Sequence, residues 1–131
     1  SPDEKTLYVA ETETGRLYAY RIAAPGEIVA PDPARPGEVV LTRIEGFKRY
    51  DSLAVEANGN ICVAGLTPGC ITVVSPEGRQ VECIAMPDEF STNICFGGQD
   101  MRTAYVTLSG SGRLISMEWP RPGLRLNFQR F

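Results

Sequence analysis

The amino-acid sequence predicts an all-β protein, and three features of the chain support this prediction. Short runs of β-branched and aromatic residues follow one another along almost the whole chain, separated by Gly, Pro and Asn. Several of these runs alternate polar and apolar residues, as a strand with one buried face does. No segment shows the period of an amphipathic helix convincingly. We therefore expect antiparallel strands joined by tight turns.

The expected strands are distributed along the chain in three groups. A Pro-rich stretch at 23–37 interrupts the first group, and we interpret it as a surface loop because proline cannot donate to a strand ladder. An Asn-Gly turn at 57–60 indicates a hairpin in the second group. The expected strands lie near 6–10, 16–22, 38–43, 53–55, 61–64, 70–74, 80–85, 92–97, 103–107 and 113–117.

One hairpin pattern occurs three times. The segments 6–20, 60–74 and 103–117 align without a gap, and glycine occupies the tenth position of each. Repeats of this size are typical of β-propellers, in which each blade has four antiparallel strands. Three blades cannot close a ring, and the first lacks the strand that should precede it. The sequence thus predicts about three four-stranded antiparallel blades of a larger propeller, at approximately 1–48, 49–90 and 91–131.

Composition and charge exclude several classes of protein. The chain has 131 residues, of which 43% are hydrophobic and 22% charged, so one compact domain is expected. A net charge of −3, without a basic cluster, argues against nucleic-acid binding. No apolar run approaches the roughly 20 residues that cross a bilayer, which argues against a membrane protein. A soluble, cytoplasmic protein is expected.

Histidine and cysteine limit the chemistry further. The chain contains no histidine, so Ser-His-Asp and Cys-His nucleophiles and His-ligated zinc are impossible within it. Its four cysteines form no C-x-x-C pair and lie among β-type apolar residues, which predicts buried, inert thiols. A contact between Cys62 and Cys70 across a hairpin is also conceivable.

Asp51 is the main candidate for a functional residue. It precedes Leu53-Ala54-Val55, where a strand is expected to begin, and a side chain at such a position can point into a shared cleft. The alternative is that Asp51 is a capping or turn residue, which is common for aspartate before a strand.

Four segments together carry a family resemblance. They are SPDEKTLYVAETETGRLYAY at the start, DSLAVEANGNICVA from Asp51, TNICFGGQDMRTAYVT from Thr92 and GRLISMEWPRPGL near the end. In this order they resemble the SMP-30/gluconolactonase/LRE-like family. The resemblance implies a six-bladed β-propeller, of which this chain would be the C-terminal half. It also places Asp51 at the metal-binding aspartate of the motif D-G-L-A-V-D-x-x-G-N, with Ser52 in place of the glycine.

The resemblance implies a divalent-metal-dependent lactonase that hydrolyses sugar lactones or related esters. Asp51 would be metal ligand and catalytic residue, and Ca²⁺ is the expected ion, with Mg²⁺, Zn²⁺ and Mn²⁺ as alternatives. Ser52, Thr92 and Asn93 would line the same cleft, although strand-end hydrogen bonding explains the last two equally well. The family's remaining metal ligands, an Asn and a Glu, would lie upstream of Ser1, so the chain alone is expected to be inactive.

Two other hypotheses remain open, a non-catalytic propeller that binds partners and a stand-alone half-propeller. If the chain is half of a propeller, whether of an enzyme or on its own, the apolar residues that would face the missing blades are expected to pack against a partner. That partner would be the N-terminal half of the same propeller or a second copy. The residues expected to be uncovered are Leu7, Val9, Tyr105 and Ile115.

Overall fold

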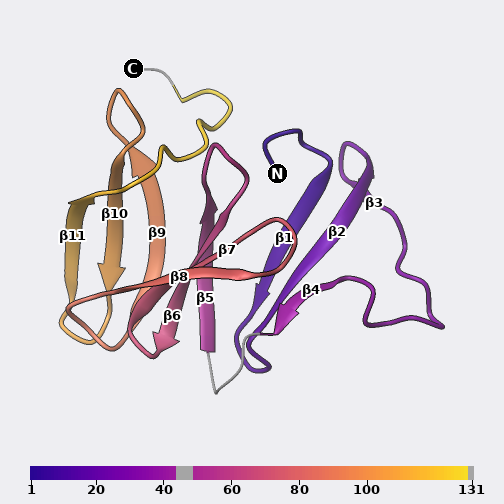
Figure 1. The fold of residues 1–131 in the computed structure, drawn as a ribbon, viewed down its shortest axis with the longest axis horizontal. Coiled ribbons are helices and arrows are strands. Elements are labelled where there is room, and N and C mark those ends of the chain that lie inside the picture. The colour runs from indigo at the N-terminus through magenta and orange to yellow at the C-terminus, as the bar shows by residue number, and fades with distance from the viewer. Residues whose placement is uncertain (44–48, 130–131) are drawn as a thin grey trace.

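The computed structural model describes residues 1–43 and 49–129, and the regular structure of these residues consists of strands (Figure 1). The strands are β1 (Thr6–Glu11), β2 (Arg16–Ala24), β3 (Glu27–Ile28), β4 (Val40–Arg43), β5 (Arg49–Val55), β6 (Ile61–Thr67), β7 (Cys70–Val74), β8 (Gln80–Ala85), β9 (Ser91–Gly97), β10 (Thr103–Leu108) and β11 (Arg113–Glu118). The expectation of an all-β chain is therefore confirmed, and the short strand β3 inside the Pro-rich loop is an addition to it. Strand β5 also begins earlier than expected, so that Asp51 is its third residue.

The strands form three antiparallel sheets, which stand side by side in Figure 1. In the first sheet β2 pairs with β1, β3 and β4; the central sheet has the order β5-β6-β7-β8; and the third has the order β9-β10-β11. Four strands were expected in the third sheet, and the described part of the chain has three. After β11 the chain continues into residues 119–129, here called the tail. Prolines at 120 and 122 lack the N–H that a strand ladder needs, so the tail leaves this sheet.

Each of the three repeated sequence segments forms a β-hairpin in the structure. Strands β1-β2, β6-β7 and β10-β11 are the three copies, paired in the same register. Two of the three aligned glycines, Gly15 and Gly112, have left-handed φ values of 61° and 62°, a conformation that glycine adopts without strain. Strands β5 and β9 precede the second and third copies, and the described residues contain no counterpart before β1. Closure of a ring and the blade boundaries stay predictions.

Two apolar clusters hold the sheets together. Between the first and central sheets, Leu17 and Tyr50 pack with Ile61, Val63 and Val74. Between the central and third sheets lies a larger cluster that includes Ile71, Val73, Ile94, Phe96, Val106 and Trp119. The central sheet is therefore covered on both faces, which explains why β6 and β7 read as continuous apolar runs instead of alternating.

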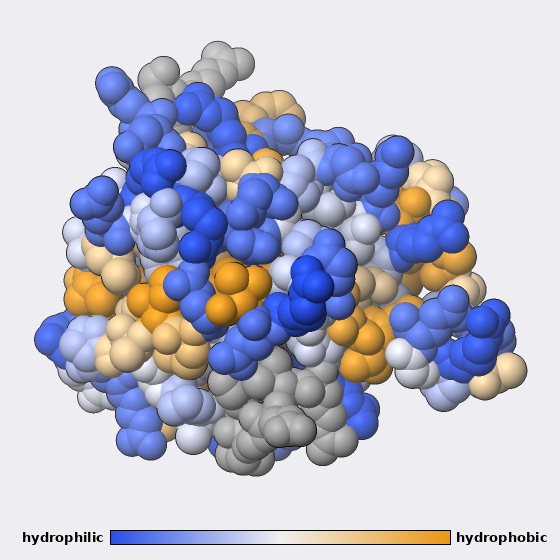
Figure 2. Space-filling model, viewed as in Figure 1, coloured by the Kyte–Doolittle hydropathy of each residue, from blue (hydrophilic) through white to orange (hydrophobic). Residues whose placement is uncertain are grey.

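The outer faces of the flanking sheets carry exposed apolar side chains. Leu7, Val9 and Tyr105 are 46%, 39% and 39% exposed, as expected for faces that would meet further blades. Ile115 was expected to be exposed as well, but it is half-buried and packs on the larger cluster, because it lies on the inward face of β11. On the face drawn in Figure 2, apolar surface forms a band across the middle of the sheets, with hydrophilic surface above and below it.

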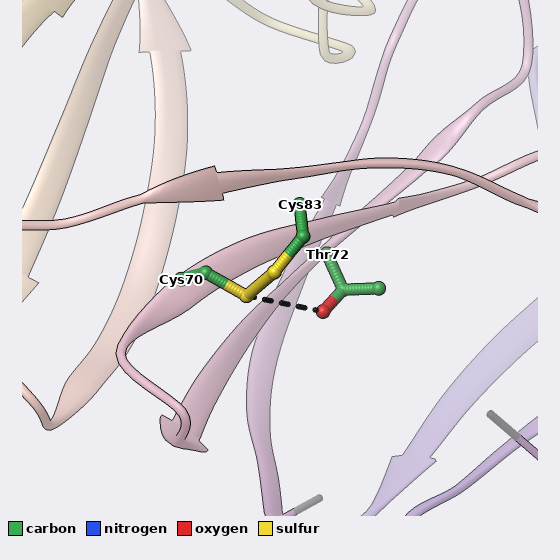
Figure 3. Close-up of a disulfide and its surroundings, with 3 residues drawn as sticks. All are labelled: Cys70, Thr72 and Cys83. Carbon is green, nitrogen blue, oxygen red and sulfur yellow. Dashed lines mark hydrogen bonds between the residues drawn. A yellow bond between two sulfur atoms is a disulfide. The ribbon is translucent and has the colours of Figure 1, made fainter. Parts of the chain in front are cut away.

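The cysteines differ from the expectation of four buried thiols. Cys70 of β7 and Cys83 of β8 form a disulfide (Figure 3), Cys62 is a buried free thiol and Cys95 is exposed. A contact between Cys62 and Cys70 does not occur. Cys62 belongs to the larger cluster, whereas Cys70 lies on the opposite face of the central sheet, where its diagonal neighbour on the next strand is Cys83.

Candidate functional site

The candidate residues lie at the beginnings of two neighbouring strands. Asp51 and Ser52 are near the start of β5, and Thr92 and Asn93 are near the start of β9. These strands form edges of their sheets and pack against each other, and both begin at the lower side of the molecule in Figure 1. The fold thus brings the two pairs to the same rim, here called the mouth.

A β-bulge interrupts each strand at the mouth. In β5, Tyr50 pairs with Gly65 and Leu53 with Val63, so Asp51 and Ser52 together lie opposite the single residue Ala64. In β9, Ser91 pairs with Leu108 and Asn93 with Thr107, which leaves Thr92 as an extra residue. Bulges bend a strand and redirect side chains, and they are frequent beside active sites. Both bulges occupy the same position of the repeat, which no residue pattern had indicated.

The carboxylate of Asp51 is free to bind a ligand. The side chain is half-buried, and among residues 1–43 and 49–129 it has no hydrogen-bond or ion-pair partner. The nearest cation along the strand, Arg49, is engaged elsewhere, because its Nη2 lies 2.7 Å from Oε1 of Glu13. An unpaired, half-buried carboxylate is unusual for a residue with only a structural role.

The residues that precede Asp51 and Thr92 are buried. Tyr50 is fully buried, and burial raises its pKa to about 12, so its hydroxyl stays protonated at neutral pH. Among the residues that the structure describes, its oxygen has no hydrogen-bond partner, nor has the hydroxyl of the fully buried Ser91 at the start of β9. Unpaired buried hydroxyls are uncommon in proteins, and here they occur close to the mouth.

Thr92 and Asn93 make local hydrogen bonds. The Oγ1 atoms of Thr92 and Thr107 lie 2.8 Å apart, and Oδ1 of Asn93 accepts from the N–H of Ile94 at 2.8 Å. These contacts are of the strand-end kind that the alternative hypothesis describes. Contact of either residue with a substrate stays a prediction.

The donor set fits a hard cation only in part. A carboxylate oxygen suits Ca²⁺ or Mg²⁺, and Ca²⁺ takes about six to eight oxygen ligands. In the described ranges no three His, Cys, Asp or Glu side chains are grouped so that they could hold a metal. Asp51 can therefore supply one carboxylate ligand, and further oxygens would come from hydroxyl, amide or backbone carbonyl groups, from water or from outside this chain.

A second carboxylate, Glu56, is the centre of a buried cluster that sequence reasoning missed. Glu56 is fully buried just after β5 and accepts hydrogen bonds from Trp119 Nε1 at 2.7 Å and from Asn60 Nδ2 at 2.9 Å. Nε of Arg121 lies 2.6 Å from its Oε2, and the same guanidinium pairs with Glu82 of β8. Nothing in the sequence connects Glu56 with residues more than 60 positions later.

The charges in this cluster stabilise one another. Burial alone would raise the pKa of Glu56, but the hydrogen bonds from Arg121, Trp119 and Asn60 outweigh it and hold that pKa below its ordinary value. Burial, together with the nearby Glu56 carboxylate, raises the pKa of the Cys62 thiol, so this sulfur stays a thiol. Arg121 balances the charge of Glu56, and this carboxylate, held by three donors, is not available as a base.

Comparison with known structures defines the class of fold. The chain superimposes on a calcium-binding protein, regucalcin, from Agrobacterium tumefaciens with a TM-score of 0.73 and 20% identity, covering 96% of this chain and 48% of that one. Together with the three antiparallel sheets, this likeness identifies a fold of the β-propeller type.

The sequence then identifies the family. The profile of the SMP-30/gluconolactonase/LRE-like region matches residues 1–110, and the chain belongs to this family. It is 30% identical over 128 residues to 6-deoxy-6-sulfogluconolactonase from Pseudomonas putida. The aligned residues cover 94% of this chain and 41% of the relative. It is also 30% identical over 108 residues to pentonolactonase XacC from Haloferax volcanii, covering 82% and 35%. The chain thus spans about two fifths of the length of these relatives. Within the described residues, no helix is long and apolar enough to span a membrane.

Proposed function

We propose that the native polypeptide that carries this chain is a divalent-metal-dependent lactonase, and that Asp51 is its ligand from this part of the chain. The relatives named as lactonases support the reaction class. The observation that carries the proposal is the placement of Asp51, whose unpaired carboxylate lies in a β-bulge at the mouth. Ca²⁺ is the preferred ion, because carboxylate oxygen is a hard ligand and no histidine is present.

The residues at the mouth have separate roles in this proposal. A bound divalent ion would polarise the lactone carbonyl and lower the pKa of a bound water. Asp51 would hold the ion, and Arg49 does not compete for its carboxylate, because Nη2 of Arg49 pairs with Glu13. The hydroxyl of Ser52 and the side chains of Thr92 and Asn93 are polar groups on the same rim, and they would orient the hydroxyls of a sugar lactone.

A partner must complete the site and cover the first sheet. Leu7 and Val9 pair with Tyr20 and Tyr18 across β1 and β2, so these four side chains lie on one face, which points away from the central sheet. We expect the N-terminal half of the same propeller to pack there and to supply the remaining metal ligands, or a second copy to do so. The mass of the native polypeptide, with light scattering of the isolated 131-residue chain, tests this. A stable monomer of that chain with lactonase activity would refute it.

Substitution of Asp51 in the native polypeptide tests the function. We expect Asp51→Ala to lower metal-dependent lactone hydrolysis at least about 100-fold, since both a charge and a metal bond are lost, while the far-UV circular dichroism stays unchanged. Asp100→Ala is the matched control, because this exposed aspartate only accepts from the N–H of Arg102 in a turn. Undiminished activity of Asp51→Ala would remove Asp51 from the site. A wild-type protein that hydrolyses no lactone would favour the non-catalytic propeller.

The disulfide between Cys70 and Cys83 argues against the expected cytoplasmic location. Disulfides such as Cys70–Cys83 persist mainly in oxidising compartments, outside the cytosol. Fractionation of the producing cells, with the thiols alkylated at lysis, decides between the two locations.

A further inference from the structure

The tail crosses the free edges of β5 and β9 at the end opposite the mouth. Gly123 forms a bridge with Glu56, the N–H of Leu124 donates to the carbonyl of Val55 at 2.8 Å, and the N–H of Ala57 donates to the carbonyl of Pro122 at 2.9 Å. The N–H of Glu56 donates to the carbonyl of Asn60, on the side of β5 that faces β6. The contacts with the tail therefore lie on the opposite edge of β5, which β6 does not use. Figure 1 shows the tail passing over the upper ends of the strands.

Further contacts anchor the tail to several parts of the molecule. The N–H of Gly123 donates to the carbonyl of Met101 at 2.8 Å, and Nε2 of Gln129 donates to the carbonyl of Phe96 in β9 at 3.3 Å. Nδ2 of Asn127 donates to Glu4 at 3.1 Å, in the segment before β1. The tail therefore contacts the central and third sheets and the segment that precedes the first sheet. In a closed propeller the free edges of the inner strands face the central channel, so the tail would cover one end of that channel.

An apolar pocket lies between the tail and the two strands. Its cavity volume is about 360 Å³, and its walls are residues 53–55 of β5, residues 94–96 of β9, and Leu124 and Leu126 of the tail, with Ser1 at its margin. The lining side chains are uncharged, and the α-amino group of the lining residue Ser1 donates to the carbonyl of Thr6 at 2.8 Å. Ligand pockets of about this size and apolar character are typical of small-molecule sites.

The pocket lies along the same two strands as the mouth. Asp51 and Leu53 are two residues apart on β5, and Thr92 and Ile94 are two residues apart on β9, so at a rise of roughly 3.3 Å per residue the pocket begins about 7 Å from the mouth. A lactone whose ring is held at Asp51 could therefore extend a substituent along both strands toward the tail.

We propose that the tail is the floor of the substrate site, and that its residues Leu124 and Leu126 select lactones that carry an alkyl substituent. This inference rests on the proposed lactonase function and adds the substrate class to it. Sugar hydroxyls placed against these walls would lose their hydrogen bonds to water without replacement, whereas methylene groups gain from leaving water. Each methylene that enters the pocket is expected to raise kcat/KM by up to about fourfold.

The first experiment measures kcat/KM of the native polypeptide for γ-lactones with side chains from methyl to hexyl and for glucono-δ-lactone. We expect kcat/KM to increase along the alkyl series by at least about tenfold in total, and Leu124→Asn to flatten this increase. Leu114→Asn is the control, because Leu114 is 68% exposed on β11 and does not line the pocket. Hydrolysis of lactones without dependence on side-chain length, or an unaltered dependence in Leu124→Asn, overturns the inference. Absence of hydrolysis of every lactone contradicts the proposed function instead.

The second experiment measures ligand binding to the pocket by the labelling rate of Cys95, and it does not depend on catalysis. Cys95 lines the pocket and is an exposed free thiol, whereas Cys62 is buried. We expect γ-decalactone to slow labelling of Cys95 by a maleimide at least about fivefold, and glucono-δ-lactone to leave it unaffected. Equal labelling rates with and without γ-decalactone overturn the inference even if Leu124→Asn fails to fold.

Discussion

Removal of Arg121 should leave a buried carboxylate without its cation. Glu56 is fully buried, and Arg121, whose side chain is 27% exposed, is its only ion-pair partner among the described residues. Breaking a buried pair on one side costs about 3–5 kcal/mol. Glu56 keeps its hydrogen bonds from Trp119 and Asn60, so for Arg121→Ala we expect a loss at or just below the lower end of this range, about 2–3 kcal/mol at pH 7.

The pH dependence of this loss identifies its cause. In the wild type, the pKa of Glu56 lies below the ordinary 4.5, so its contribution to stability is present above that pH and is lost as the pH falls through the folded-state pKa. Without Arg121, burial dominates and the pKa of Glu56 rises. The variant should therefore be most destabilised at neutral pH, and its deficit should shrink at pH 4.

Urea unfolding of the native polypeptide at pH 7 and pH 4 measures both effects. Adding Glu56→Gln to Arg121→Ala should recover much of the loss, because the neutral amide still accepts from Trp119. Arg79→Ala is the control, since the Arg79–Glu77 pair is exposed and should contribute less than about 1 kcal/mol. A loss below about 1 kcal/mol for Arg121→Ala at both pH values would refute the reasoning.

Three further predictions concern packing and the buried polar groups. Gly123→Ala should destabilise the protein by about 1–3 kcal/mol in urea unfolding, because the added Cβ would overlap the ring of Phe96, whereas Gly37→Ala, which faces open space, should be neutral; equal effects would contradict the packing described. One thiol, Cys95, should react with Ellman's reagent in the native chain, two after unfolding and all four after reduction; four without reduction would disprove the disulfide. Tyr50→Phe removes a buried hydroxyl that has no partner, so stability should be unchanged or slightly higher, and a loss above about 1 kcal/mol would reveal a hidden partner.

The local structure of this protein could be predicted well from sequence, because strand signals are local. β-Branched runs and turn residues indicated the strands from β1 to β11 except the two-residue β3, and the aligned glycines indicated the repeated hairpin. The family could also be recognised from four segments, and the matched region confirms it. The choice of Asp51 came from that family motif, since an aspartate before a strand is by itself most often a turn or capping residue.

Contacts between distant segments could not be predicted. The pairing of Cys70 with Cys83 depends on which faces of β7 and β8 the side chains share, and a β-bulge or a change of register would alter it. The half-burial of Ile115 depends in the same way on which face of β11 meets the core.

The sequence alone determined that this chain is built of β-hairpins, that its chemistry excludes imidazole, and that Asp51 is the residue to examine. Those properties depend on residue types and on neighbours along the chain. Only the tertiary structure decided that β5 and β9 both bulge at the mouth, that the tail contacts these strands near their other ends, and that Glu56 pairs with Arg121. The physical reason is that these features arise from packing between segments far apart in sequence, where burial and hydrogen bonding act together and no local pattern records the partner.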